Sequence, residues 1–101
     1  MLLKTGMRLA SSTDTTQVIV TRATADDVDL RCGGAPMVIA GEAVTETAID
    51  PAFADGTAMG KRYGGDDLPV ELLCTKPGPG TLSIGTEPLP LKEAKALPAS
   101  D

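Results

Sequence analysis

Two cysteines, Cys32 and Cys74, are the first candidates for chemistry in this sequence of 101 residues, because thiolates act as nucleophiles and as metal ligands. The sequence has no histidine, so the commonest general base and every Ser–His or Cys–His nucleophile pair are missing. A cysteine nucleophile would need a nearby cation to lower its pKa. Arg31 precedes Cys32, but neighbours on a strand point to opposite faces. We therefore expect no catalytic residue and interpret both cysteines as small buried side chains, with a ligand or reactive thiol as the alternative for Cys32.

The acidic and glycine-rich clusters lack the spacing of known ligand loops. Asp26-Asp27 and Asp66-Asp67 could offer oxygens to calcium, but neither pair stands in the D-x-D-x-D-G pattern that gathers ligands from one loop. Gly33-Gly34 and Gly64-Gly65 fit neither the P-loop nor the dinucleotide-binding pattern. The acidic pairs predict solvated turns and the glycine clusters predict β-turns, and we expect no metal and no cofactor.

One segment brings two cations and an aromatic ring together. Lys61, Arg62 and Tyr63 are consecutive, and Arg and Tyr are enriched at the energetic centres of protein interfaces. We therefore predict that these three residues bind a partner. A half-buried Tyr63 that closes a small core is the alternative for the ring.

The charge balance limits the class of partner. The net charge is −5 and the pI is about 4.5, whereas nucleic-acid binders cluster Lys and Arg to displace counterions from phosphates. The same balance disfavours an anionic membrane surface, and no apolar run approaches the roughly 20 residues of a spanning helix. No signal-peptide pattern begins the chain, so two widely spaced cysteines favour reduced thiols in the cytoplasm. We expect a partner that is another protein chain or a second copy, with no nucleic acid and no membrane.

Short β-branched and alternating runs, separated by Gly and Pro, indicate a small single domain that is mostly β and built from short antiparallel strands. Two of these runs, joined by a turn, predict a hairpin of 18–20 with 28–32. Further strands are expected at 37–39, 70–74 and 81–84, and a single helical turn at 51–55.

The two ends of the chain differ in composition from its middle. Residues 1–16 end in a Ser/Thr-rich run, and residues 93–101 are rich in Ala, Lys and Pro, so we expect a flexible leader and a flexible tail. The β domain is expected to span 17–92.

An internal repeat appears when the chain is shifted by 52 positions against itself without a gap. The shift superposes Val18 on Val70, Val20 on Leu72, Leu30 on Leu82, Gly33 on Gly85, Pro36 on Pro88, Met37 on Leu89 and Ile39 on Leu91. It suggests two pseudo-repeated hairpin units that pack on each other, although unrelated hairpins with Gly and Pro turns can align in the same way. We expect the recurring apolar residues to be buried, namely Val18, Val20, Leu30, Met37, Leu72, Leu82 and Ile84.

The segment from Leu30 to Met37, Leu-Arg-Cys-Gly-Gly-Ala-Pro-Met, resembles the second metal knuckle of desulforedoxin and of the amino-terminal domain of desulfoferrodoxin, Leu-x-Cys-Cys-Gly-x-x-Met. The run from Gly80 to Leu89 is similar to the Gly-Thr-Leu approach to that knuckle. Cys32 matches the first Cys of the family's doublet, and Cys74 matches the second Cys of the preceding Cys-x-x-Cys. The resemblance covers roughly a third of the chain.

The departures from that family concern the ligands themselves. Glu71 stands at the first Cys of the pair, Gly33 replaces a ligand, and Ile84 and Gly85 replace the doublet. A tetrahedral site needs four ligands, and each copy offers one. The resemblance therefore implies a knuckle-like hairpin that has lost its metal.

These observations favour a small non-enzymatic accessory or interaction protein that binds another protein or associates with itself through exposed strand edges. A degenerate rubredoxin-like metal or electron-transfer protein that uses Cys32 and Cys74 is one alternative. A small non-catalytic subunit of a larger enzyme is the other.

Overall fold

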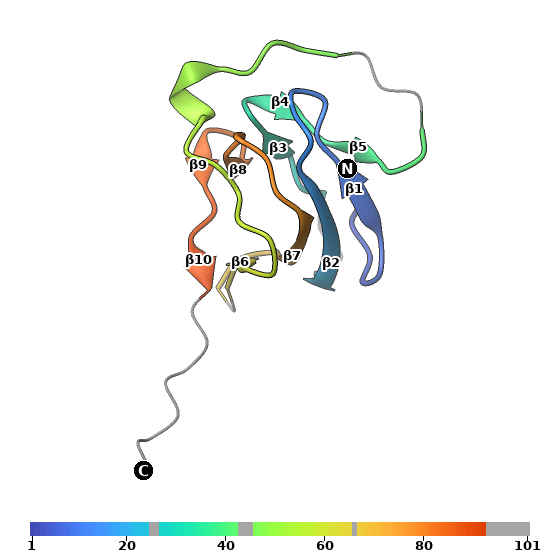
Figure 1. Cartoon of the computed structure of the whole chain (residues 1–101). Helices are drawn as coiled ribbons and strands as arrows, with labels where there is room; N and C mark the ends of the chain where they lie inside the picture. Colours follow the sequence, from blue (N-terminus) through green and yellow to red (C-terminus); the bar gives the residue numbers. More distant parts are fainter. Residues whose placement is uncertain (25–26, 43–45, 66, 93–101) are drawn as a thin grey trace.

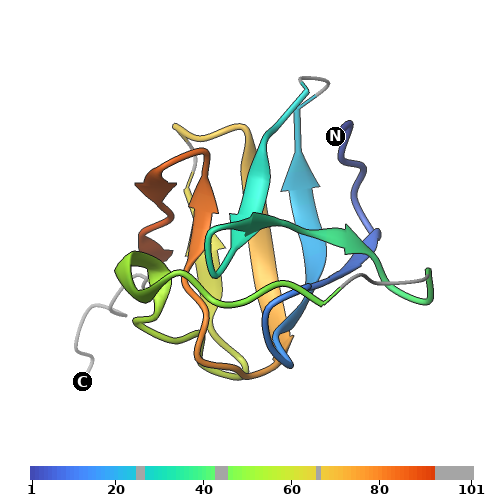
Figure 2. The ribbon, with the colours of Figure 1, turned by 90° about the horizontal axis from the view of Figure 1, so that it is seen from above.

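Two antiparallel β-sheets face each other across an aliphatic core in the computed structural model, which describes residues 1–24, 27–42, 46–65 and 67–92 (Figure 1; Figure 2). In these ranges the larger sheet has the order β10-β6-β7-β2-β1-β5 and the smaller sheet the order β4-β3-β8-β9. The elements are β1 (Arg8–Ala10), β2 (Gln17–Ala23), β3 (Leu30–Cys32), β4 (Ala35–Pro36), β5 (Val38–Ile39), the 3₁₀ turn η1 (Pro51–Phe53), β6 (Arg62–Gly64), β7 (Val70–Lys76), β8 (Leu82–Ile84), β9 (Glu87–Pro88) and β10 (Leu91–Lys92). The expected small, mostly β domain of short antiparallel strands is confirmed.

The two halves of the chain repeat one pairing pattern. In the first half β1 pairs with β2 and β5, and β3 pairs with β4; in the second half β6 pairs with β7 and β10, and β8 pairs with β9. The halves join through β2 with β7 and through β3 with β8. The internal repeat is thus a repeat of structure, with a pseudo-twofold relation between the halves.

The two copies form matching hydrogen bonds directly after the β3–β4 hairpin and directly after the β8–β9 hairpin. The Met37 N–H donates to the Leu30 carbonyl at 3.0 Å, and the Leu89 N–H donates to the Leu82 carbonyl at 2.9 Å. Met37 and Leu89 are both buried, so each copy returns an apolar side chain to the core after its turn.

The hairpin turns explain the glycine shared by the two copies. Gly33 and Gly85 open the turns with φ of 66° and 59°, a region that L side chains seldom adopt. In the first copy Gly34 also has positive φ, as a two-residue type I′ hairpin turn requires.

The core lies between the sheets and follows the strand alternation. Six of the seven residues expected to be buried are at most 2 % exposed, namely Val18, Val20, Leu30, Met37, Leu72 and Leu82. Ile84 is the exception, since it is half-buried and packs at the margin of the cluster.

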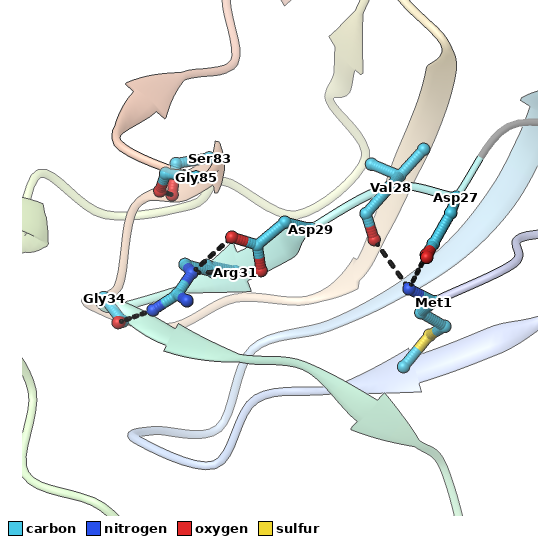
Figure 3. A network of polar contacts seen from close by, with 8 residues as sticks. All are labelled: Met1, Asp27, Val28, Asp29, Arg31, Gly34, Ser83 and Gly85. Carbon is cyan, nitrogen blue, oxygen red and sulfur yellow. Dashed lines mark hydrogen bonds and ion pairs between the residues drawn. The ribbon is translucent and has the colours of Figure 1, made fainter.

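The flexible leader expected for residues 1–16 is wrong. Leu3 and Leu9 are 3 % and 0 % exposed, and β1 pairs with both β2 and β5. The Met1 amino group also contacts the Asp27 carboxylate and donates to the Val28 carbonyl at 3.0 Å (Figure 3). The Ser/Thr-rich run resembled a linker because it is the loop of the β1–β2 hairpin. The expected tail, 93–101, lies outside the described residues.

The predicted hairpin of 18–20 with 28–32 is also wrong. β2 lies in the larger sheet between β1 and β7, whereas β3 lies in the smaller sheet between β4 and β8. β2 and β3 each take their longest or main pairing from the other half of the chain, β2 with β7 and β3 with β8. The segment that joins β2 to β3 therefore leads from one sheet to the other.

The connection between the halves is tied across one end of the sheets (Figure 2). Thr47 N–H donates to the Ser12 carbonyl and Asp50 N–H to the Gly33 carbonyl, both at 2.9 Å. The single helical turn expected at 51–55 is found as η1, with the Asp50 carboxylate accepting from the Ala52 N–H at 3.0 Å. No helix in the described part of the chain is long and apolar enough to cross a membrane.

Leu82→Ala is expected to lower the free energy of unfolding by about 2–5 kcal/mol, because it leaves a cavity beside β3 in the core. Thermal and urea unfolding measure the loss. Leu91→Ala is the matched control, since Leu91 is 46 % exposed. Equal stability of the two variants would contradict the position of the core.

Leu9→Ala tests the place of the N-terminal segment in the domain. Leu9 is fully buried and Leu2 is 61 % exposed, so Leu9→Ala should lower Tm by well over 5 °C while Leu2→Ala leaves it nearly unchanged. A Tm that neither substitution changes would restore the flexible leader.

Candidate functional site

The predicted partner-binding residues separate into exposed cations and a packed ring. Lys61 and Arg62 are exposed, whereas Tyr63 is half-buried and packs against the core. The Tyr63 hydroxyl accepts a hydrogen bond from the Ala58 N–H at 2.9 Å. The alternative interpretation of Tyr63, a ring that closes the core, therefore describes its place in the fold. Partner binding by Lys61, Arg62 and Tyr63 stays a prediction.

Arg62 belongs to a row of side chains that crosses the outer face of the larger sheet. Arg62 lies opposite Leu73, Leu73 opposite Ile19, and Ile19 opposite Arg8. Residues directly opposite each other on paired strands share a face of the sheet. On β2 and β7 the residues on either side of Ile19 and Leu73 are buried, so Ile19 and Leu73 lie on the outer face. We call Arg8, Ile19, Leu73 and Arg62 the outer row.

The outer row has a charged end on each side of an aliphatic centre. Arg8 and Arg62 are exposed, while Ile19 and Leu73 are half-buried. The row spans three inter-strand steps, so the ends of the backbone row lie about 14 Å apart. Arg8 and Arg62 begin the first strand of their halves, which makes them equivalent in the repeat.

These two arginines differ from the other two in the chain. Arg22 donates to the Gly65 and Leu68 carbonyls, and Arg31 forms an ion pair with Asp29 at 3.0 Å (Figure 3). Within the ranges that the structure covers, no hydrogen bond or ion pair engages the guanidinium of Arg8 or Arg62. The outer row therefore presents two free guanidinium groups on a chain of net charge −5.

Arg8 was missed by sequence reasoning because it lies in the presumed leader. Arg8-Leu9-Ala10 and Arg62-Tyr63-Gly64 are 54 positions apart, not 52. The connections between strands differ in length between the two halves, so a gapless shift could not align both strands and turns.

A cavity of about 570 Å³ lies at the end of the sheets beside the β1–β2 loop, and its lining includes the residues from Ser11 to Thr16 together with Lys76. The Asp14 carboxylate organises the loop, because it accepts the Thr16 N–H at 2.7 Å and the Thr13 hydroxyl at 3.4 Å. Six of the eleven described lining residues carry a hydroxyl, namely Ser11, Ser12, Thr13, Thr15, Thr16 and Thr47, so the lining mixes polar and apolar surface.

Gly80 lets the β7–β8 turn approach this loop. A Cβ at Gly80 would clash with an oxygen of the Asp14 carboxylate and would lie 2.9 Å from the Cys32 sulfur. Gly80 therefore serves the close packing of the two loops, because any larger residue would separate them.

The Cys32 thiol lies fully buried beside this loop. Burial raises the pKa of the thiol from 9.0 to about 11; the Ser11 hydroxyl opposes this shift and the Asp14 charge adds to it. Burial also raises the pKa of Cys74, whose thiol donates to the Lys76 carbonyl at 3.2 Å. Both cysteines are free and buried, as expected, and a protonated thiol is a poor nucleophile at neutral pH.

The positions that depart from the desulforedoxin pattern have structural roles. Glu71 is 6 % exposed and accepts the Thr21 hydroxyl at 2.6 Å, and Gly33 forms the hairpin turn. In the parts of the chain that the structure describes, no three His, Cys, Asp or Glu side chains are grouped to hold a metal ion. Comparison of the chain with family models, curated proteins and solved structures finds no match. The resemblance to desulforedoxin stays a prediction.

The raised pKa of Cys32 predicts a loss of stability at alkaline pH. The unfolded thiol ionises near pH 9 while the folded thiol holds its proton to about pH 11, so the stabilising contribution is complete below pH 9 and is lost between these values. Urea unfolding between pH 7 and 11 should show this loss of stability. When each protein is compared with its own free energy of unfolding at pH 7, Cys32→Ala should lose less than the wild-type chain. An identical pH dependence in both proteins would contradict the shift.

Proposed function

We propose that the protein is a small non-enzymatic interaction protein and that it binds a protein partner through the outer row. The observation that carries the proposal is the pair of unengaged guanidinium groups, Arg8 and Arg62, on either side of Ile19 and Leu73. No ion pair within the described residues engages either arginine, so both guanidinium groups are free to bind a partner.

The chemistry of the row favours a carboxylate-bearing protein segment. Arg binds carboxylates through paired N–H donors, and these contacts give orientation as well as attraction. Ile19 and Leu73 are still partly exposed, so a covering side chain would remove apolar surface from water at about 25 cal/mol per Å². Two arginines on an acidic chain are too few for the counterion release that drives nucleic-acid binding.

The absence of a catalytic role is part of the proposal and rests on chemistry. The sequence lacks histidine, and burial keeps both thiols protonated at neutral pH. We also place the protein in the cytoplasm, where free cysteines such as Cys32 and Cys74 stay reduced.

The test compares two charge reversals of equal size. The immobilised full chain should capture a partner from an extract of its native host, and Arg8→Glu/Arg62→Glu should reduce the captured amount by about tenfold or more. Lys4→Glu/Lys76→Glu is the matched control, because both lysines are exposed and lie outside the row. Quantitative mass spectrometry of the bound chains gives the measurement. Equal capture by all three proteins would refute the outer row as the binding surface.

A further inference from the structure

The two ends of the domain, which the repeat makes equivalent, are covered differently. The shift of 52 positions superposes Cys32 on Ile84 and Gly33 on Gly85. Cys32 is 0 % exposed, whereas Ile84 is half-buried and is the one expected core residue that the core does not enclose. Ile84 therefore marks a surface that is covered in the first copy and open, within the described residues, in the second.

In the first copy, the connection between the halves covers the hairpin turn. The Asp50 N–H donates to the Gly33 carbonyl at 2.9 Å, and the backbone of Asp50 is extended. A Cβ at Gly33 would lie 3.1 Å from Cγ1 of Ile49, and a Cβ at Gly34 would lie 2.7 Å from the Cβ of Asp50. The connection thus lays an aliphatic side chain and a backbone donor against this turn.

The turn at Gly85 has no such cover among the described residues. A Cβ at Gly85 would have one neighbour within 4 Å, an oxygen of Asp29 at 3.9 Å (Figure 3). Gly65, in the loop before β7, has no side chain to fill the space. A cavity of about 530 Å³ lies here, and its apolar lining comes from that loop and from the region of β8 and β9. We call it the Ile84 groove, with the apolar residues Leu68, Pro69, Ile84, Pro88, Leu89 and Pro90.

Two acidic side chains also line the Ile84 groove. Asp67 and Glu87 are exposed, and no hydrogen bond or ion pair within the described ranges engages either carboxylate. The Arg22 guanidinium does not neutralise them, because it donates to the Gly65 and Leu68 carbonyls. The charge of the groove therefore favours a partner that carries Lys or Arg.

We propose that the Ile84 groove binds an extended segment of another protein, in which Lys or Arg residues flank an aliphatic side chain. The aliphatic side chain covers Ile84, and the basic side chains pair with Asp67 and Glu87. A backbone N–H of the segment donates to the Gly85 carbonyl, as the Asp50 N–H does to Gly33 in the first copy. In this mode of recognition, main-chain hydrogen bonds give affinity and side-chain pockets give specificity.

The same charges disfavour a second copy of this chain as the occupant. Each copy has a net charge of −5 and the groove itself is acidic, so two copies repel each other at this surface. The groove shares no residue with the outer row. It is therefore a separate surface, and it stands or falls independently of the proposed function.

The probe for the groove is the capped pentapeptide Lys-Ala-Ile-Lys-Pro. It keeps Ala48, Ile49 and Pro51 of the connection and has Lys in place of Thr47 and Asp50. Because one aliphatic side chain is buried and exposed ion pairs contribute little, we expect a Kd of about 1 mM. Titration of the isotope-labelled full chain, followed by NMR, should shift the amide signals of the residues that line the groove.

Two peptide controls separate the apolar contact from the ionic ones. Lys-Ala-Ser-Lys-Pro should bind at least about fivefold more weakly, because Ser cannot cover the apolar lining. Glu-Ala-Ile-Glu-Pro should also bind more weakly, because its charges repel the groove. Equal binding of all three peptides would overturn the proposal.

A charge reversal of the protein completes the test. Asp67→Lys/Glu87→Lys should weaken binding of the basic peptide by at least about fivefold and should favour the acidic one. Glu42→Lys/Asp55→Lys is the matched control, because it makes the same change in net charge at exposed positions outside the groove lining. An unchanged Tm confirms that both variants fold.

The remaining outcomes identify a different occupant or none. No binding up to about 5 mM, shifts confined to other surfaces, or equal binding by the two double variants would overturn the groove as a site. Shifts of the Ile84 and Gly85 amides that grow with the concentration of the chain alone would identify a second copy. Nuclear Overhauser contacts from Ile84 to residues 93–101 of the same molecule would identify the chain's own end. Either result would overturn another protein as the partner.

Discussion

The antiparallel pairing of β2 with β7 is the interaction on which the rest of the structure depends. The other strands have only two or three residues, and such short strands cannot form a stable sheet in one half alone. Pairing Val18 with Cys74 and Val20 with Leu72 places four side chains in one core. The same pairing joins the two copies of the repeat, so the domain exists only as the pair.

The register of that central pair also creates the outer row. Because side chains alternate along a strand, burial of Val20 and Leu72 turns Ile19 and Leu73 to the other face, and a slip of one residue would exchange the two sets. β1 and β6 then extend the face symmetrically and add Arg8 and Arg62. The candidate interface is therefore a consequence of how the core is packed.

Polar contacts and close packing join two loops at one end of the sheets, and this packing limits the reactivity of the Cys32 thiol. The Asp14 carboxylate organises the β1–β2 loop, and Gly80 brings the β7–β8 turn close to Asp14 and to the Cys32 sulfur. A buried thiol packed in this way keeps its proton and fills space. Chemistry at Cys32 would require this end of the domain to open.

The sequence by itself determined the fold class, the Gly turns, the single turn at 51–55 and six of the seven expected core residues, because alternation and backbone preference are local properties. It also showed Arg62 but not Arg8, and it suggested a leader where β1 lies. Only the tertiary structure decided the partner of each strand, since β2 pairs with β7 and β3 with β8 across about fifty residues of chain. Contacts between distant strands are selected by the joint burial of both halves, and no local pattern records which distant strand completes a sheet.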